Sequence, residues 1–232
     1  MTLLAMLRHG DTPWTRDGLV QGRTDTSLDA LARATLSAVA VPAQFSGLSV
    51  VTSPLLRCVQ TAQQLGLRDV RVEPRVAEMS WGAWEGKRLR DLRSTLGEAM
   101  ALNEARGLDF RPPGGESPRE VLARVRPWLE ELAAQDLPTL AICHRGVMRV
   151  VFASALRWDM TGKAPARLDW TALQVFELTV GAGVRVVALN VPLERAHLSA
   201  TDANGAQTGG SVHLFQQPCC TVVANAQVAL HQ

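Results

Sequence analysis

Two histidines, His9 and His144, each follow a short apolar stretch and stand in the triplets Arg-His-Gly and His-Arg-Gly. The apolar stretches predict buried strands, and open α/β sheets bind ligands beyond the carboxyl ends of their strands. We therefore expect the two imidazoles to meet at one sheet edge. Arg8, and Arg57 at the start of a predicted helix, would add two guanidinium groups and the positive end of that helix. This set predicts a pocket for a dianionic phosphate, in which a neutral imidazole accepts a phosphoryl group.

Glu78 is the candidate proton donor for the leaving oxygen. It lies in a loop rich in tryptophan and glycine, where partial burial and a nearby phosphate charge would both raise the pKa of its carboxyl group. After protonating the leaving group, the same carboxylate would activate a water molecule. Glu85 lies in the same loop and is the competing carboxylate, with anchoring of the loop as its alternative role.

The segments that must position these residues alternate between short apolar strands and amphipathic helices. Ser53 and Pro54 suit the N-cap and first position of a helix, and Ser117 with Glu120 forms a capping-box pattern. The predicted strands cover residues 3–7, 48–52, 70–72 and 139–143, followed by a hairpin at 173–178 and 184–189. The predicted helices cover residues 28–41, 53–65, 87–104, 118–134 and 147–156. This alternation predicts an α/β fold, a three-layer α/β/α sandwich with a mainly parallel sheet.

The chain is expected to hold one catalytic domain, residues 1–192, and a C-terminal tail, residues 193–232. Within the tail, residues 199–211 are small, polar and rich in glycine, without helical or strand periodicity. No secondary structure is assigned to the tail from its sequence.

The composition is that of an ordinary soluble globular protein, with 232 residues, 47% of them hydrophobic, and a net charge of +2. The 22 arginines are nearly balanced by acidic residues and are not concentrated in one stretch, which argues against nucleic-acid binding. No apolar stretch is long enough to span a membrane, and the first residues lack the features of a signal peptide, so we expect an untargeted chain. The four cysteines have neither C-x-x-C nor zinc-ligand spacing, which predicts no metal site and a reducing, cytoplasmic location.

Six segments carry a resemblance to a known family: Leu7–Thr12, Gln21–Asp25, Ser53–Ala62, Glu78–Gly86, Gly114–Ser117 and His144–Val147. In this order they resemble the successive motifs of the histidine phosphatase superfamily, in the branch that includes cofactor-dependent phosphoglycerate mutase. The resemblance covers about residues 3–189. It implies a phosphoglycerate mutase-like fold and a reaction through a phosphohistidine intermediate.

The resemblance also implies individual roles for the five residues singled out above. His9 would be the phosphorylated nucleophile and Glu78 the proton donor. The phosphate would be held by Arg8, Arg57 and His144.

Four further positions bear on substrate binding. Gln21 and Gly22 match positions that touch substrate in the mutases. Thr15 stands where the family usually has an asparagine that contacts the phosphate, and its hydroxyl could replace part of that contact. Arg145 stands where a small residue is common, and it would either add positive charge near the pocket or point away from it.

The reaction predicted from these features is hydrolysis of a small phosphorylated metabolite, with no metal ion and no cofactor. Only 65 residues lie between Glu78 and His144, which resembles the compact phosphatases, including alpha-ribazole phosphatase and broad-specificity relatives. The mutases carry a long insertion here, so a phosphoglycerate-type mutase is the first alternative and a non-catalytic phosphate-binding module is the second. The sequence names no particular substrate, and it leaves a homodimer open.

Overall fold

The computed structural model describes residues 1–181 and 183–196. A six-stranded sheet forms their centre, with the strand order β4-β3-β5-β1-β6-β7. Its strands are β1 (Thr2–Arg8), β3 (Ser49–Thr52), β4 (Arg71–Val72), β5 (Thr139–Cys143), β6 (Leu173–Thr179) and β7 (Gly183–Val191). The first four of these run parallel to one another, whereas β6 and β7 form an antiparallel hairpin beside β1. The predicted α/β fold with a mainly parallel sheet is confirmed.

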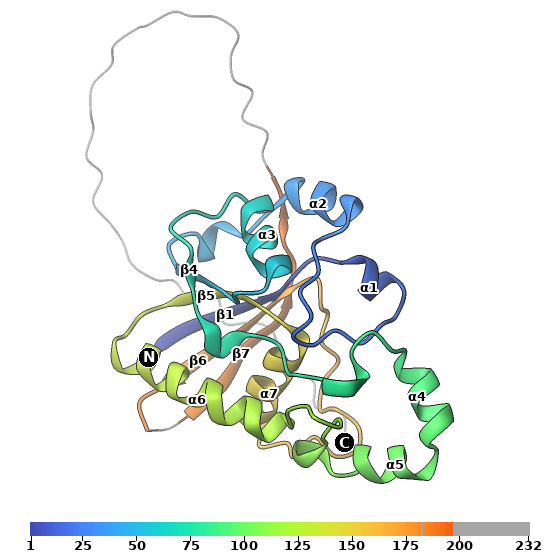
Figure 1. The fold of residues 1–232 in the computed structure, drawn as a ribbon. Helices are drawn as coiled ribbons and strands as arrows, with labels where there is room; N and C mark the ends of the chain where they lie inside the picture. Colours follow the sequence, from blue (N-terminus) through green and yellow to red (C-terminus); the bar gives the residue numbers. More distant parts are fainter. Residues whose placement is uncertain (182, 197–232) are drawn as a thin grey trace, which may run out of the picture. The chain divides into compact units, whose positions relative to one another are not determined.

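Helices cover both faces of this sheet (Figure 1). On one face lie α2 (Ala30–Ser37) and α3 (Leu56–Gln64), and on the other lie α6 (Pro118–Ala134) and α7 (Arg145–Leu156). Successive side chains of a strand point to opposite faces, so β1 contributes to two separate cores. Leu4 and Met6 pack in the core that holds α6 and α7, and Ala5 and Leu7 pack in the core that holds α3. Burial on both faces explains why β1 and β5 are continuous apolar stretches.

The register between β1 and β5 sets the position of the two histidines. Arg8 is the partner of Cys143 in this parallel pair, so the two strands end at the same level. His9 and His144 are the next residues of their strands, and the backbone N–H of His9 still donates to the carbonyl oxygen of Cys143 at 3.0 Å. Adjacent strand ends therefore place both imidazoles at one edge of the sheet.

Four predicted helices differ from the structure, and the one predicted for residues 147–156 begins earlier, at Arg145. The helix predicted for residues 87–104 is two helices, α4 (Leu89–Leu96) and α5 (Glu98–Glu104), because Gly97 takes a φ of 52° and breaks the helix between them. The helix predicted from residue 53 begins at Leu56, and its N-cap, Leu55, makes no side-chain capping bond. The helix predicted for residues 28–41 ends at Ser37 and is followed by the short strand β2 (Val39–Ala40). The capping box of Ser117 and Glu120 is confirmed at the start of α6.

Shorter elements complete the described residues. The helix α1 (Pro13–Arg16) follows the loop that begins at His9, and four 3₁₀ turns lie at Ala43–Phe45, Pro74–Val76, Gly82–Trp84 and Gly107–Asp109. The strand β8 (Glu194–Arg195) pairs with β2, although it lies beyond the predicted domain boundary at residue 192. The rest of the predicted tail, from residue 197, lies outside the described residues. In the described part of the chain, no helix is both long enough and apolar enough to cross a bilayer.

Candidate active site

His9 is almost fully buried at the end of β1, and its ring orientation is set by its own backbone. The Nδ1 atom lies 2.7 Å from the carbonyl oxygen of Gly10. A carbonyl oxygen only accepts hydrogen bonds, so Nδ1 carries the proton and the lone pair of the neutral ring lies on Nε2. Burial lowers the pKa of His9 well below its usual value, and the charges of Arg8 and Arg57 lower it further. The ring is therefore a neutral imidazole at neutral pH, with Nε2 available as a nucleophile.

His144 lies beside His9, with a distance of 5.2 Å between the ring centroids. It is the fully buried N-cap residue of α7, and burial is the main reason that its pKa is lowered. Its Nε2 lies 2.7 Å from the hydroxyl oxygen of Ser53 and 3.3 Å from the sulfur of Cys58. Ser53 follows β3, so three neighbouring strand ends contribute to this cluster. The N-cap of α3 is Leu55, so the prediction that Ser53 caps this helix is wrong, and the hydroxyl of Ser53 instead lies against His144.

Arg57 lies in the first turn of α3, and its side chain has no exposed surface. Its two terminal nitrogens donate to the carbonyl oxygens of Thr24 at 3.0 Å and Gly22 at 2.8 Å. Among the described residues, its Nε atom has no hydrogen-bond partner, and the same is true of the buried Nε atom of Arg8. A buried guanidinium group held by carbonyl oxygens keeps its positive charge uncompensated, which suits an anionic ligand.

Glu78 is buried opposite the N-terminus of α7. Both of its carboxylate oxygens accept the backbone N–H of Gly146, at 3.1 and 3.2 Å, and Oε1 also accepts that of Met79 at 2.8 Å. Burial raises the pKa of Glu78, although these backbone hydrogen bonds act in the opposite direction. The carboxyl group thus holds a proton at higher pH than an exposed glutamate, as a general acid requires.

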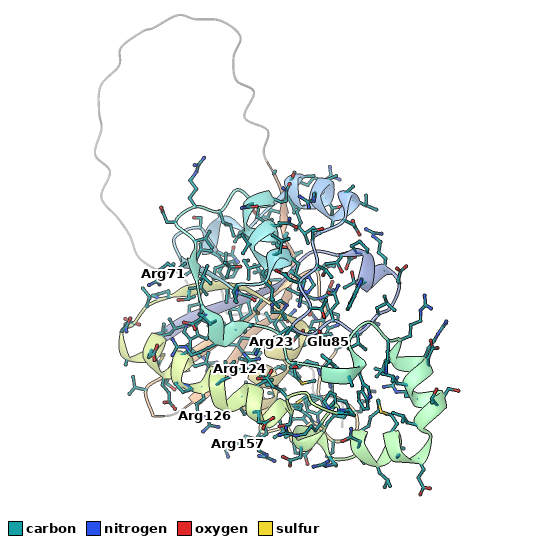
Figure 2. All side chains as sticks on the ribbon, in the orientation of Figure 1. Arg23, Arg71, Glu85, Arg124, Arg126 and Arg157 are labelled. Atoms are coloured by element: carbon teal, nitrogen blue, oxygen red, sulfur yellow. The ribbon has the colours of Figure 1, made fainter. Side chains whose placement is uncertain are left out.

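The loop that contains Glu78 is held in place by Arg124 of α6. One terminal nitrogen of Arg124 donates to the carbonyl oxygens of Ala77 at 2.7 Å and Glu78 at 3.2 Å, and the other donates to that of Arg75. Its Nε donates to the carboxylate of Glu116 at 3.0 Å. Glu116 in turn accepts the backbone N–H of Ser80 and pairs with Arg23. Arg23 and Arg124 are labelled in Figure 2.

Glu85 anchors a second loop rather than acting in the reaction centre. Its carboxylate accepts the backbone N–H groups of Arg23 at 2.9 Å, Thr24 at 2.8 Å and Trp81 at 3.1 Å. A Cβ atom at Gly22 would collide with this carboxylate and with the backbone nitrogen of Trp81. Glycine at this position therefore permits the close approach that presents two carbonyl oxygens to Arg57.

A cavity of about 430 Å³ opens over these residues. Five of the predicted site residues line it, namely Arg8, His9, Thr15, Gln21 and Glu78, as does Arg145. Gly22, Arg57 and His144 are not among its lining residues, and the side chains of Arg57 and His144 are fully buried next to it in the cluster described above.

The two polar residues predicted to bind substrate also have structural contacts. The hydroxyl of Thr15 accepts the backbone N–H of Thr12 at 2.8 Å in the capping box of α1 and reaches Asp11 at 3.2 Å. The amide nitrogen of Gln21 donates to the hydroxyls of Thr12 and Thr26, while its buried amide oxygen has no partner among the described residues. Thr15 therefore shapes the loop beside the cavity, and Gln21 retains a free acceptor.

Comparisons with known proteins agree with this geometry. A family model described as histidine phosphatase superfamily (branch 1) matches residues 4–192. The chain belongs to this superfamily. Glucosyl-3-phosphoglycerate phosphatase of Mycobacterium tuberculosis (strain CDC 1551 / Oshkosh) is 32% identical over 190 residues, which are 73% of this chain and 84% of the relative. It is one of several phosphatases to which this histidine phosphatase is similar.

Two more comparisons extend the similarity. The 6-phosphofructo-2-kinase/fructose-2,6-bisphosphatase 1 of Bos taurus is 29% identical over 201 residues, which are 83% of this chain but only 41% of that longer protein. The solved complex of mycobacterial glucosyl-3-phosphoglycerate phosphatase with inorganic phosphate has a TM-score of 0.67 and 28% identity, covering 83% of this chain and 98% of that one. This histidine phosphatase is a hydrolase of phosphomonoesters.

Three supporting residues of this histidine phosphatase were not predicted from the sequence as parts of the site: Ser53, Glu116 and Arg124. Ser53 and Glu116 stand inside the motifs that carry the family resemblance, so those motifs could have indicated both residues. Local capping rules instead assigned Ser53 to the start of a helix. Arg124 stands outside every motif, on a helix whose charged positions are otherwise mostly exposed. In the described parts of the chain, no group of three or more acidic, histidine or cysteine side chains is placed to hold a metal ion.

Proposed function

We propose that His9 is the nucleophile and Glu78 the general acid and base of this phosphatase. In the first step, Nε2 of His9 forms a bond to phosphorus while the ester P–O bond breaks and Glu78 gives its proton to the departing oxygen. In the second step, Glu78 takes a proton from water as the water oxygen attacks phosphorus and the P–N bond breaks. The products are an alcohol and inorganic phosphate, and both side chains return to their starting states.

Arg8, Arg57 and His144 bind the phosphoryl oxygens in this proposal. The unpartnered Nε atoms of the two arginines support this role, since buried donors are normally satisfied. Positive charges that are fixed before the reaction stabilise the charge on the transferring group without further reorganisation. The ring of His144, which its contact with Ser53 holds in place, would donate an N–H hydrogen bond to the same phosphoryl group.

One observation carries the proposal. A neutral imidazole with Nε2 free and a carboxyl group with a raised pKa line the same cavity, as a nucleophile and an acid must. The named relatives act on glucosyl-3-phosphoglycerate and fructose 2,6-bisphosphate, which supports a small phosphorylated sugar derivative as the substrate. Gln21 and Thr15 would contact that substrate from the loop that follows α1. A cytoplasmic location and a homodimer stay predictions from the sequence.

The test compares two variants with a radiolabelled aryl phosphate. The phenolate of this probe leaves without protonation, so Glu78→Gln should still transfer phosphate to His9 but hydrolyse the intermediate slowly. Acid-labile label should therefore accumulate on Glu78→Gln and be absent from His9→Asn. Label on His9→Asn, or full turnover by that variant, would contradict the proposal. Release of inorganic phosphate, rather than transfer to a second hydroxyl, distinguishes hydrolysis from mutase activity.

A further inference from the structure

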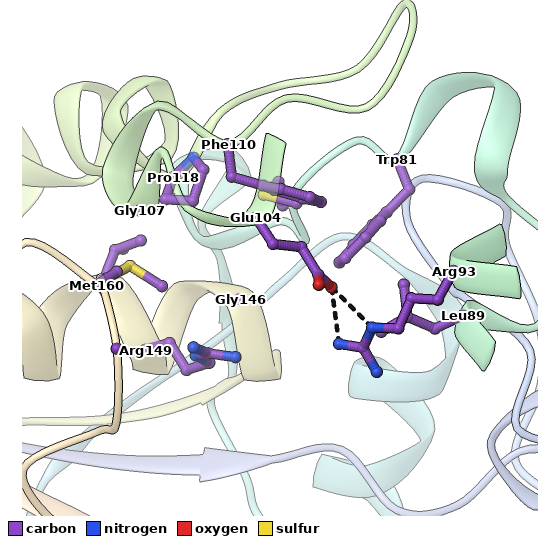
Figure 3. Close-up of a pocket in the computed structure, with 13 residues that line it drawn as sticks. Trp81, Leu89, Arg93, Glu104, Gly107, Phe110, Pro118, Gly146, Arg149 and Met160 are labelled. Atoms are coloured by element: carbon purple, nitrogen blue, oxygen red, sulfur yellow. Dashed lines mark hydrogen bonds and ion pairs between the residues drawn. The ribbon is translucent and has the colours of Figure 1, made fainter. Parts of the chain in front are cut away.

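A second cavity, of about 300 Å³, adjoins the active-site cavity. The two share Trp81, Leu89, Gly146 and Arg149 in their walls, so they form one continuous cleft. Figure 3 shows this second cavity. Glu78, the proposed proton donor, accepts the backbone N–H groups of Met79 and Gly146, which both line the second cavity. A leaving group that Glu78 protonates would therefore lie on the side where the two cavities meet.

The second cavity has both apolar and polar walls, and its apolar side chains include Trp81, Phe110 and Met160. Two charged residues on one side, Arg93 of α4 and Glu104 of α5, form an ion pair at 2.7 Å and so neutralise each other (Figure 3). A leaving group in this space therefore meets little net charge from that side.

Arg149 is different, because it reaches in from α7 without a carboxylate. Among the described residues it makes no ion pair or hydrogen bond, although it is only partly exposed. Its guanidinium carbon lies 5.8 Å from the ring centroid of Trp158, within the range of a cation–π contact. The indole ring orients the guanidinium group and leaves its N–H donors free.

Arg145 repeats this arrangement one helical turn earlier. It lines the active-site cavity, and its guanidinium carbon lies 4.9 Å from the ring centroid of Trp170. Residues four apart on a helix lie on the same face, so Arg145 and Arg149 present two cations in a row along the cleft. Other arginines of this chain, such as Arg75 and Arg119, are instead paired with carboxylates.

We propose that Arg145 and Arg149 bind a second anionic group, which the substrate carries on the alcohol that leaves. Among the described residues, neither guanidinium group has a carboxylate partner. Such groups are suited to an oxyanion, because their paired donors match carboxylate and phosphate oxygens. This inference rests on the proposed function, since it takes the phosphate at His9 as the fixed end of the substrate.

The test uses three matched substrates: glycerol 3-phosphate, 3-phosphoglycerate and glycerol 1,3-bisphosphate. They share a three-carbon chain, and the far end carries a hydroxyl, a carboxylate or a phosphate. We expect the unsubstituted enzyme to have a kcat/KM roughly 10- to 100-fold higher for at least one of the two doubly anionic substrates, as loss or gain of a charge-assisted contact produces. The better of the two identifies the second anion.

Arg149→Met should remove most of this preference and change kcat/KM for glycerol 3-phosphate by less than about threefold. Arg145→Met should lower kcat/KM for the better doubly anionic substrate more than for glycerol 3-phosphate. Arg149→Lys should restore part of the preference, and the exposed Arg126→Met, on α6, should leave all three values unchanged. Equal kcat/KM values for the three substrates, or an equal loss on all of them in Arg149→Met, would overturn the inference while hydrolysis itself persists. Failure to hydrolyse any phosphomonoester would instead overturn the proposed function and this inference with it.

Discussion

Arg124→Met tests whether α6 positions the general acid. Arg124 is about one-fifth exposed, and its replacement would remove a donor from three backbone carbonyl oxygens and one of the partners of the Glu116 carboxylate, which keeps Ser80 and Arg23. Each unsatisfied polar group costs about 1–3 kcal/mol when fully buried, and partial exposure and rearrangement reduce the sum. We expect a loss of roughly 2–4 kcal/mol, which corresponds to about 4–16 °C in Tm for a domain of this size.

The same replacement should lower kcat by about tenfold or more, because the Glu78 loop loses its support and small displacements of catalytic groups are costly. The positive charge of Arg124 lowers the pKa of Glu78, so its removal should shift the alkaline limb of the kcat–pH profile to higher pH. A merely structural residue would not move that limb.

The assays are thermal unfolding and the pH dependence of phosphate release. Arg126→Met is the matched control, since Arg126 lies two residues along the same helix and is exposed. If Arg124→Met unfolds and turns over like Arg126→Met, with the same pH profile, then α6 does not position Glu78.

Two further predictions concern the histidines. Ser53→Ala should lower kcat by about 5- to 50-fold and leave KM nearly unchanged, because His144 loses its 2.7 Å hydrogen bond. Ser53→Cys should recover part of the rate. Equal kcat values for the unsubstituted protein and both variants would exclude a role of Ser53 in positioning His144. The pKa of His144 is lowered in the folded state, so the unfolded chain binds a proton that the folded chain does not, and stability should fall as pH drops below about 6.5. His144→Gln should therefore lose less Tm between pH 7.5 and pH 5.5 than the unsubstituted protein, and parallel losses would refute this explanation.

The fold was predictable where local patterns and tertiary packing agree. The strand at residues 139–143 and the helix at 118–134 have the predicted bounds, the first because it is buried on both faces and the second because of its capping box. The positions of His9 and His144 followed from the rule that parallel strands end at one edge. The burial pattern, the capping box and the order of strands and helices can all be read from a single sequence.

Other parts of the site depend on contacts between distant residues. Ser53 suits a helix cap by local rules, but its hydroxyl lies against His144, 91 residues further along the chain. Arg124 supports a loop that precedes it by 46 to 49 residues. No periodicity or capping pattern encodes such pairs, because they arise only when α6 packs beside the end of the sheet.

The burial of the site explains the direction of the pKa shifts of His9, the proposed nucleophile, and Glu78, the proposed acid. Removal from water disfavours the charged form of any group, so the same environment lowers the pKa of His9 and raises the pKa of Glu78. Arg57 cannot lose its charge in this way, and it is tied to carbonyl oxygens rather than to a carboxylate. One buried layer therefore combines a neutral imidazole, a carboxyl group with a raised pKa and a cation without a carboxylate partner among the described residues, which are the properties that the proposed reaction of a dianionic phosphate requires.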